Sequence, residues 1–309
     1  MVENFETGVE TMQQRKYGNT DLMVSVLGFG GAEIGFRGAS VADVERLLGS
    51  ALDAGLNVID TAACYATSEE LIGRAVGHRR SEYYLFTKCG HASGLSTPDW
   101  HPKTITASID RSLQRLGTDY VDVIHLHSCS LEVLQQGDVI EALQKARDAG
   151  KTRYIGYSGD GQAALYAVES GVFDSLETSV NIADQEAIEL TLPKARERGM
   201  GVVVKRPIAN AAWLHSSLPE NTYIQPYWRR LQALDYDLTK RGARDSVAAA
   251  LRFTLTVPGV HTAIVGTSNL NRYVENAAMV AEGPLAEDEY EAIRRRWKEV
   301  AQADWVGLE

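Results

Sequence analysis

The sequence is poor in cysteine, in basic residues and in long apolar runs. Its 309 residues include three cysteines, an odd number that cannot pair completely within one chain. This use of cysteine is typical of the reducing cytoplasm. Lys and Arg together number 31 against 41 Asp and Glu, which gives a net charge of −10. We expect neither nucleic acid nor an anionic membrane as a partner, because both attract basic surfaces.

No run of about 18 uncharged apolar residues occurs, so no transmembrane helix is expected. The first 19 residues open with acidic side chains and contain no apolar stretch, which does not fit a secretory signal peptide. There is no low-complexity tract and no domain linker. We therefore expect a cytoplasmic protein with a single domain over residues 1–309, in which residues 1–14 form a flexible extension. The sequence does not indicate its oligomeric state.

Eight short segments rich in β-branched residues alternate with longer segments of helical periodicity. They cover residues 24–30, 57–60, 84–88, 121–127, 152–158, 175–180, 201–205 and 262–266. Eight βα units in series predict a closed (β/α)8 TIM barrel. The doubly wound alternative should carry G-x-G-x-x-G after its first strand, and the segment 28–35 lacks that pattern.

Local signals refine this barrel. Ser40 with Asp43 resembles a helix N-terminal capping box, and apolar residues then recur on one helical face until Ala54-Gly55. Residues 16–20 suit the turn of an N-terminal hairpin that closes the barrel floor. The connection 206–244 is too long for a simple link, so we expect a substrate-side insertion after the seventh strand.

Polar residues stand where several predicted strands end, and this is the edge at which TIM barrels place their active sites. Asp60 ends the second strand and Tyr65 follows it, while Lys88 and His127 end the third and fourth. Because side chains alternate along a strand, His127 should point to the same side of the sheet as His125, and the other strand-end residues should follow the same rule. Each residue alone would suit a capping, solvated or core position. Four of them at one barrel face favour a catalytic site.

These residues carry a family resemblance. The segment 57–62 followed by Tyr65 resembles the signature of the aldo-keto reductases, as do residues 68–73. Three further segments match in the same order: Thr87-Lys88, residues 116–122 leading to His127, and residues 266–269 with Arg272, Glu275 and Asn276.

The resemblance implies reversible reduction of a small carbonyl compound, such as an aldehyde, a ketone or a sugar, to its alcohol. Tyr65 would be the general acid in reduction and the base in oxidation. A phenol has an ordinary pKa of about 10, and we expect the ammonium of Lys88 to lower it. Asp60 would pair with Lys88, and His127 would donate a hydrogen bond to the substrate oxygen.

The resemblance also implies a nicotinamide cofactor and no metal. Arg272 matches the family arginine that meets the adenosine 2′-phosphate, which favours NADP(H) and leaves NAD(H) open. The residues expected to contact the cofactor are Gly31, Asp60, Ser158, Glu177, Lys205, Arg206, Gly266, Thr267, Ser268, Arg272 and Asn276.

The chain departs from the family pattern on the nicotinamide side. Gly159 follows Ser158 where the family has asparagine, and Glu177 stands where the family has glutamine. A carboxylate can accept from the cofactor amide but cannot donate to it. Lys205-Arg206 replaces the usual stacking aromatic residue. The stack could come instead from an aromatic of the insertion, namely Trp213, Tyr223, Tyr227 or Trp228, although these residues also suit packing within the loop.

Two other functions remain open on the sequence alone. One is a redox-responsive, NADP-binding regulatory or partner subunit of the same fold. The other is a metal-dependent barrel hydrolase that uses His125 and His127, in which case Lys88 and Tyr65 would have no role. Separately, the cysteines at the expected catalytic rim, Cys64, Cys89 and Cys129, suit small side chains in tight turns. A thiol near Lys88 with a lowered pKa would instead make the activity sensitive to oxidants.

Overall fold

Eight parallel strands close into a barrel in the computed structural model, which describes residues 12–308. Each strand pairs with the next along the chain, and β10 closes the ring between β9 and β3. This confirms the predicted (β/α)8 barrel. The strands are β3 (Leu27–Gly30), β4 (Val58–Asp60), β5 (Tyr84–Cys89), β6 (Val121–His127), β7 (Thr152–Ser158), β8 (Ser175–Ser179), β9 (Gly201–Lys205) and β10 (Thr262–Val265).

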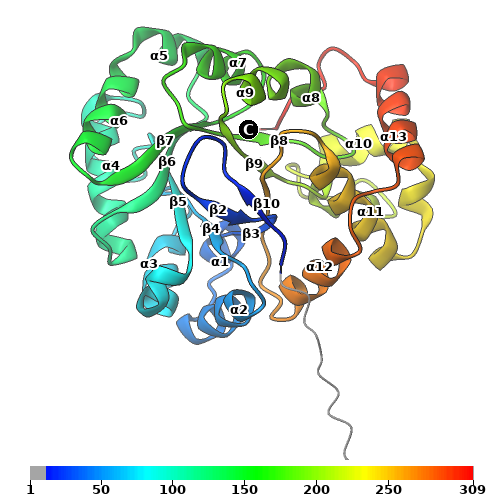
Figure 1. Cartoon of the computed structure of the whole chain (residues 1–309), viewed down its shortest axis with the longest axis horizontal. Helices are drawn as coiled ribbons and strands as arrows, with labels where there is room; N and C mark the ends of the chain where they lie inside the picture. Colours follow the sequence, from blue (N-terminus) through cyan, green and yellow to red (C-terminus); the bar gives the residue numbers. More distant parts are fainter. Residues whose placement is uncertain (1–11, 309) are drawn as a thin grey trace, which may run out of the picture.

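Helices surround the barrel (Figure 1). None of the helices within residues 12–308 is both long and apolar enough to cross a membrane. The helices are α1 (Ala32–Phe36), α2 (Val41–Asp53), α3 (Ser68–Val76), η1 (Gly77–Glu82), α4 (Pro102–Leu116), α5 (Leu131–Gln136), α6 (Asp138–Asp148), α7 (Gly161–Ser170), α8 (Glu186–Leu190), α9 (Leu192–Glu197), η2 (Ala209–Leu214), α10 (Gln225–Leu234), η3 (Asp237–Lys240), α11 (Ala243–Thr256), α12 (Arg272–Ala281) and α13 (Glu287–Val300).

The expected start of the first long helix is confirmed in α2. The Ser40 side chain accepts a hydrogen bond from the backbone N–H of Asp43 at 3.1 Å, which satisfies one of the free donors of the first turn. The buried face of α2 consists of the predicted apolar residues Val44, Leu47, Leu48, Ala51 and Leu52.

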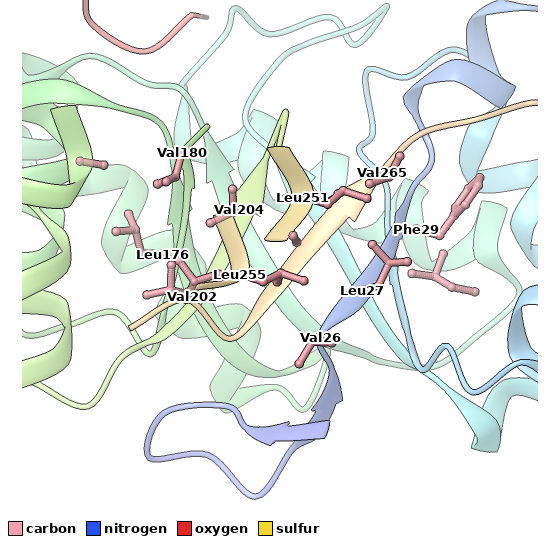
Figure 2. Packing of buried hydrophobic residues seen from close by; sticks show 14 of the residues in the cluster. Val26, Leu27, Phe29, Leu176, Val180, Val202, Val204, Leu251, Leu255 and Val265 are labelled. Atoms are coloured by element: carbon pink, nitrogen blue, oxygen red, sulfur yellow. The ribbon is translucent and has the colours of Figure 1, made fainter. Parts of the chain in front are cut away.

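Alternation along the strands separates two apolar layers. Val202 and Val204 of β9 pack outward against the helices, and Figure 2 shows them with Leu251 and Leu255 of α11. Val203 faces the barrel interior together with Val58, Phe86, Val123 and Ile264. Residues two positions further along β4, β5 and β6 therefore also face inward. This places Asp60, Lys88 and His125 directly above the apolar interior layer.

An antiparallel hairpin closes the lower end of the barrel, as predicted. It consists of β1 (Gln14–Lys16) and β2 (Met23–Ser25), and it lies across the barrel in Figure 1. Tyr17, Leu22 and Val24 of the hairpin are fully buried against the apolar interior layer. Gly201 makes room for this plug, because a Cβ at that position would overlap the Tyr17 ring.

Two predicted boundaries were wrong. The expected strand 24–30 is divided between β2 and β3, because Ser25 pairs with Gln14 in the hairpin whereas Leu27 pairs with Ala263 in the barrel. The expected extension over 1–14 also overlaps the fold. Gln14 belongs to β1 and Met12 packs against the core, while residues 1–11 lie outside the described part of the chain.

The insertion after β9 is largely helical. The connection 206–242 contains η2, α10 and η3, and α11 has already begun at Ala243. Three consecutive residues other than glycine, Ala209, Asn210 and Ala211, have left-handed backbone conformations with φ of 45°, 53° and 51°. Left-handed residues other than glycine are uncommon and concentrate at functional sites.

We predict that Gly201→Ala destabilises the protein by about 1–3 kcal/mol, because the added methyl group forces the Tyr17 plug to shift. Urea unfolding measures this change. Gly77→Ala is the matched control, since Gly77 has right-handed backbone angles and open space around its Cβ position. Equal stability of the two variants would contradict the tight fit of the plug.

Candidate active site

The centre of the site is a buried ammonium group between two carboxylates. Lys88, at the upper end of β5, is 1% exposed, and its ammonium donates to a carboxylate oxygen of Asp60. Glu177 Oε2 lies 3.3 Å from the same ammonium, and both carboxylates are almost completely buried. Charged groups inside a barrel are stable only when they are paired.

Burial and pairing act together on these three groups. Burial, and then the neighbouring Glu177 carboxylate, raise the pKa of Asp60 well above its ordinary value. Burial also opposes the charge of Glu177, but Lys88 and then His125 bring its pKa below the ordinary value. Burial alone would lower the pKa of Lys88. The charges of Asp60 and Glu177 outweigh this effect, so the pKa of Lys88 is raised above its ordinary value. Lys88 therefore stays charged at neutral pH.

Tyr65 and His127 lie above this ion-paired centre. The segment after β4 is tied to β5 through the N–H groups of Thr61 and Ala63, which donate to Phe86 and Lys88 at 2.9 and 3.1 Å. The Tyr65 ring consequently lies 5.3 Å from Lys88 Nζ, and 5.6 Å edge-on from the His127 ring. The structure thus brings together the four residues that the sequence indicates.

The pKa of Tyr65 differs from our expectation. Lys88 acts in the expected direction, but burial is the larger effect, and it raises the pKa of Tyr65 above its ordinary value. Burial, and then the Lys88 charge, lower the pKa of His127 well below its ordinary value. At neutral pH the site therefore holds a protonated phenol beside a neutral imidazole.

A polar chain continues from the centre to the barrel floor. His125 Nε2 lies 2.7 Å from Ser175 Oγ, and Ser175 Oγ lies 2.5 Å from the Tyr17 hydroxyl. The oxygen and nitrogen atoms of Asp60, His125 and Glu177 are close enough together to resemble a metal site. However, the Lys88 ammonium already contacts both carboxylates, and His127 is not part of the cluster. This arrangement favours an ion-paired centre over the H-x-H metal hypothesis.

The thiols are not activated, which corrects the lowered pKa considered from the sequence. Burial raises the pKa of Cys64, and the opposing charge of Lys88 is too weak to reverse this. Burial also raises the pKa of Cys89 and Cys129, which are both buried. Thiols in this state react slowly with oxidants.

Two adjoining hollows form an elongated groove beside the ion-paired centre. The first hollow, of about 700 Å³, extends from Asp60, Tyr65 and Glu177 past the β3 end to the insertion. The second, of about 610 Å³, lies between α11 and α12. The two hollows adjoin, because both are lined by Ile208, Ala211, Val265 and Gly266. An extended ligand could therefore reach from the catalytic residues to α12.

The predicted cofactor residues distribute along this groove. The first hollow is lined by Gly31, Asp60, Glu177, Lys205, Arg206 and Gly266, and the second by Gly266, Arg272 and Asn276. Ser158, Thr267 and Ser268 line neither hollow. Ser158 is buried at the end of β7, whereas Ser268 donates to Glu33 of α1 at 3.1 Å.

The structure accounts for two departures from the family pattern. A Cβ at residue 159 would overlap the Tyr157 hydroxyl, which donates to the Cys129 carbonyl, so glycine fits here and asparagine does not. Glu177 is already engaged with Lys88 at 3.3 Å, yet its Oε2 accepts no hydrogen bond within residues 12–308. That oxygen is buried in the ion-paired centre, between Lys88 and His125 Nδ1 at 3.8 Å.

Only one of the four candidate aromatic residues of the insertion lines the first hollow, and this is Tyr223. Its hydroxyl accepts a hydrogen bond from Arg206 Nε at 2.5 Å, and the residue is 45% exposed. Tyr227 is fully buried with its hydroxyl on Asp184, and Trp228 donates to the His215 carbonyl. Trp213 packs partly buried against the core.

Sequence reasoning missed several residues close to His127. His91 lies 2.9 Å from Asp99 and 5.2 Å, ring to ring, from His127, with Trp100 packed against it. Gly90, with φ of 124°, allows the Trp100 ring to approach, since a Cβ there would overlap that ring. A histidine and a tryptophan in the loop after a catalytic strand were the available signal.

Two more missed residues flank the groove. Phe36 of α1 is 65% exposed, and its ring lies 6.0 Å from the Tyr65 ring. Arg244 of α11 lines the second hollow opposite Arg272. The basic cluster at 240–244, immediately before the α11 pattern, was the only sequence signal for Arg244.

The chain resembles members of one protein family in both sequence and fold. The model of the Aldo/keto reductase family matches residues 26–298. L-galactose dehydrogenase of Arabidopsis thaliana is 31% identical over 287 residues, covering 88% of this chain and 89% of that protein. D-threo-aldose 1-dehydrogenase of Pseudomonas sp is 28% identical, covering 84% of this chain and 90% of that protein. The holo form of aldo-keto reductase AKR11C1 from Bacillus halodurans superposes with a TM-score of 0.79 at 27% identity, over 95% of this chain and 99% of that chain.

The barrel and the groove beside its strand ends therefore define an oxidoreductase that uses a nicotinamide cofactor, NAD(P), on carbonyl and alcohol groups. The chain belongs to the aldo-keto reductase family.

We predict non-additive stabilities for the two carboxylates that face Lys88. Asp60→Asn or Glu177→Gln alone leaves one carboxylate for the ammonium, whereas the double variant leaves a buried cation unpaired. The double variant should therefore lose about 3–5 kcal/mol of unfolding free energy, more than the sum of the two single losses. Urea unfolding of all four proteins measures this coupling. Additive losses would show that the two carboxylates act independently.

Proposed function

We propose that the protein interconverts small sugar-like carbonyl compounds and their alcohols with NADP(H), using Tyr65 as proton donor and acceptor. The observation that carries this proposal is the position of the Tyr65 ring, 5.3 Å from the paired Lys88 ammonium at the end of the first hollow. A protonated phenol, a fixed cation and an adjoining ligand groove are what carbonyl reduction requires of a protein.

In reduction, Tyr65 donates its proton to the substrate carbonyl oxygen, and the charge of Lys88 stabilises the phenolate that results. Burial keeps the phenol protonated beforehand, because it raises the pKa of Tyr65. In oxidation the same oxygen takes the proton from the alcohol. The bound nicotinamide supplies or accepts the hydride at the substrate carbon.

The other two residues of the four position these groups. Asp60 holds the Lys88 ammonium in place through its hydrogen bond. His127 is neutral and donates a hydrogen bond to the same substrate oxygen, which fixes the carbonyl against Tyr65. Neutrality suits this role, because a second positive charge next to Lys88 would be unfavourable in the buried site.

The groove residues fit a dinucleotide at both of its ends. Glu177 Oε2 accepts no hydrogen bond within the described chain and suits the amide N–H of a nicotinamide. Asn276 Oδ1, at the far end, is buried and likewise without a partner there, which suits the adenine amino group. Tyr223 is the aromatic residue that we assign to the face of the nicotinamide ring.

The remaining predicted contacts divide between the two ends of the cofactor. Arg206 and Lys205 belong to the nicotinamide end, although Lys205 is also paired with Asp160 at 3.0 Å. Ser158 lines neither hollow, but we assign it to the same end because it pairs in register with Glu177. Thr267, Ser268 and Arg272 belong to the adenosine end, where Arg272 pairs with Glu275 at 2.9 Å and is 45% exposed on its side chain. A 2′-phosphate can replace that exposed carboxylate.

Two observations support a sugar-like substrate: the names of similar proteins and the aromatic residues near Tyr65 and His127. Two of the similar proteins carry names of sugar dehydrogenases, acting on L-galactose and on D-threo-aldoses. In this chain the Phe36 ring contacts Tyr65, and the His91 ring, with Trp100 against it, contacts His127. Aromatic faces with a nearby imidazole suit a sugar, which presents C–H groups on one face and hydroxyl groups at its edge.

The three free cysteines suit the cytoplasm, which we propose as the location of the protein.

We predict that Tyr65→Phe lowers kcat for carbonyl reduction about 10²–10⁴-fold, because the proton donor is lost. The Kd for NADPH should be almost unchanged. NADPH oxidation with a panel of aldehydes, ketones and aldoses gives kcat, and fluorescence titration gives Kd. Tyr120→Phe on the exposed surface is the control. Retained turnover in Tyr65→Phe would contradict the assignment, and no turnover by the wild type would favour a regulatory subunit.

A separate prediction concerns cofactor choice. Arg272→Ala should weaken NADPH binding about tenfold or more, through loss of a charged hydrogen-bonding partner of the 2′-phosphate. NADH binding should change by less than about twofold, because NADH lacks that group. Arg46→Ala, which removes an exposed ion pair on α2, is the control. A wild type that binds NADH as tightly as NADPH would contradict the preference for NADP(H).

A further inference from the structure

We propose that Cys64 is a positioning residue that holds His127 in the tautomer with its proton on Nε2. This inference rests on the proposed function, since it concerns the hydrogen bond that His127 gives to the substrate oxygen. It assigns a role to a side chain that the proton-transfer chemistry of Tyr65 leaves unused.

The contact is direct. Cys64 Sγ lies 3.3 Å from His127 Nδ1, within hydrogen-bonding distance for sulfur. Among residues 12–308, Cys64 is the only side chain that forms a hydrogen bond with the His127 ring. The Tyr65 and His91 rings meet the imidazole only at ring distances of 5.6 and 5.2 Å, with interplanar angles of 80° and 72°. Cys64 is therefore the group that can distinguish between the two ring nitrogens.

The protonation states on both sides decide the direction of this bond. Burial, and then Lys88, keep the imidazole neutral by lowering the pKa of His127. Burial keeps Cys64 as a thiol by raising its pKa. A neutral imidazole carries one proton and one bare nitrogen, and a thiol can donate to the bare one. Sulfur is a weak acceptor whereas imidazole nitrogen is a good one, so S–H to Nδ1 is the better pairing.

The direction of this hydrogen bond determines which form of the His127 imidazole faces the substrate. With Nδ1 accepting from Cys64, the ring proton must be on Nε2, the nitrogen left for the substrate. A substrate carbonyl oxygen can then accept a hydrogen bond from Nε2–H. The opposite tautomer would present a bare nitrogen to that oxygen, and two acceptors would face one another.

The chain makes this arrangement locally. Cys64 directly precedes Tyr65, so a single short segment carries both the proton donor and the partner of His127. The segment is fixed at Ala63, whose N–H donates to the Lys88 carbonyl and whose carbonyl accepts from Arg115 at 3.1 Å. A shift of this segment would therefore move the phenol and change the imidazole together.

The first test is nitrogen NMR on protein labelled with ¹⁵N-histidine, with His127→Asn used to identify the His127 signals. The wild type at neutral pH should show a protonated Nε2 and a bare, hydrogen-bonded Nδ1. Cys64→Ser keeps a donor and should preserve this pattern. Cys64→Ala should shift the Nδ1 signal and allow both tautomers. A wild-type ring with its proton on Nδ1, or Cys64→Ala spectra identical to wild type, would overturn the proposal.

The second test is kinetic, with 4-nitrobenzaldehyde and NADPH as the probe reaction. Cys64→Ala should lower kcat/KM about 3- to 10-fold, the range expected for one neutral hydrogen bond, with unchanged NADPH affinity. Cys64→Ser should stay within about twofold of wild type. Cys129→Ala, which removes a buried thiol without a histidine contact, is the matched control. An equal loss in Cys64→Ser and Cys64→Ala would overturn the donor role of the thiol.

The two tests separate this inference from the proposed function. Failure of the wild type to reduce any carbonyl probe would overturn the proposed function. The nitrogen spectra would still decide whether Cys64 sets the tautomer. Conversely, normal turnover together with a tautomer that does not depend on Cys64 would overturn the inference and leave the proposed function intact.

Discussion

The structure depends above all on one constraint, which is that the Lys88 ammonium is buried where water cannot solvate it. The barrel meets this constraint by presenting carboxylates from two other strands, Asp60 from β4 and Glu177 from β8. β4 pairs directly with β5, whereas closure of the sheet into a barrel brings the more distant β8 to the same ammonium. The position of the charge is therefore set by the whole barrel and not by one loop.

The same burial that makes the charge costly also determines the state of its neighbours. The low-dielectric site favours the neutral forms of Tyr65 and His127, while Lys88 remains charged because it is paired. A resting site with one cation, one phenol and one neutral imidazole is prepared to give a proton. These are the protonation states that the proposed reduction requires.

Much of the fold was predictable because its signals are local. Strand segments such as 121–127 and 152–158 are bounded in the structure as the β-branched runs predict, and the Ser40 cap lies where its side chain predicts. The division of 24–30 between hairpin and barrel was not predictable, since it depends on pairing with Gln14 and Ala263, both of which are remote. The helices within 206–242 were missed because the length of a connection carries no information about its conformation.

In the site, too, local sequence signals predicted some residues but not the contacts that depend on loop conformation. Strand alternation and strand ends were enough to indicate Asp60, Lys88 and His127, since barrel geometry fixes their positions. Tyr65 lies in the loop after β4, and the family resemblance was needed to indicate it. The contacts of Cys64 with His127 and of Tyr223 with Arg206 depend on loop conformation, and no spacing rule predicts them. The pKa of Tyr65 was misjudged for a related reason. A sequence names the neighbouring charge but does not say how completely water is excluded.

The hairpin at the barrel floor also excludes water from the buried site. Tyr17 plugs the barrel from below, and its hydroxyl ends the polar chain through Ser175 to His125. Water entering there would reach Glu177 and Lys88 from the side opposite the substrate and would screen the field between ammonium and phenol. The N-terminal hairpin thus keeps water from the floor side of the ion-paired centre, on which the proposed proton transfer depends.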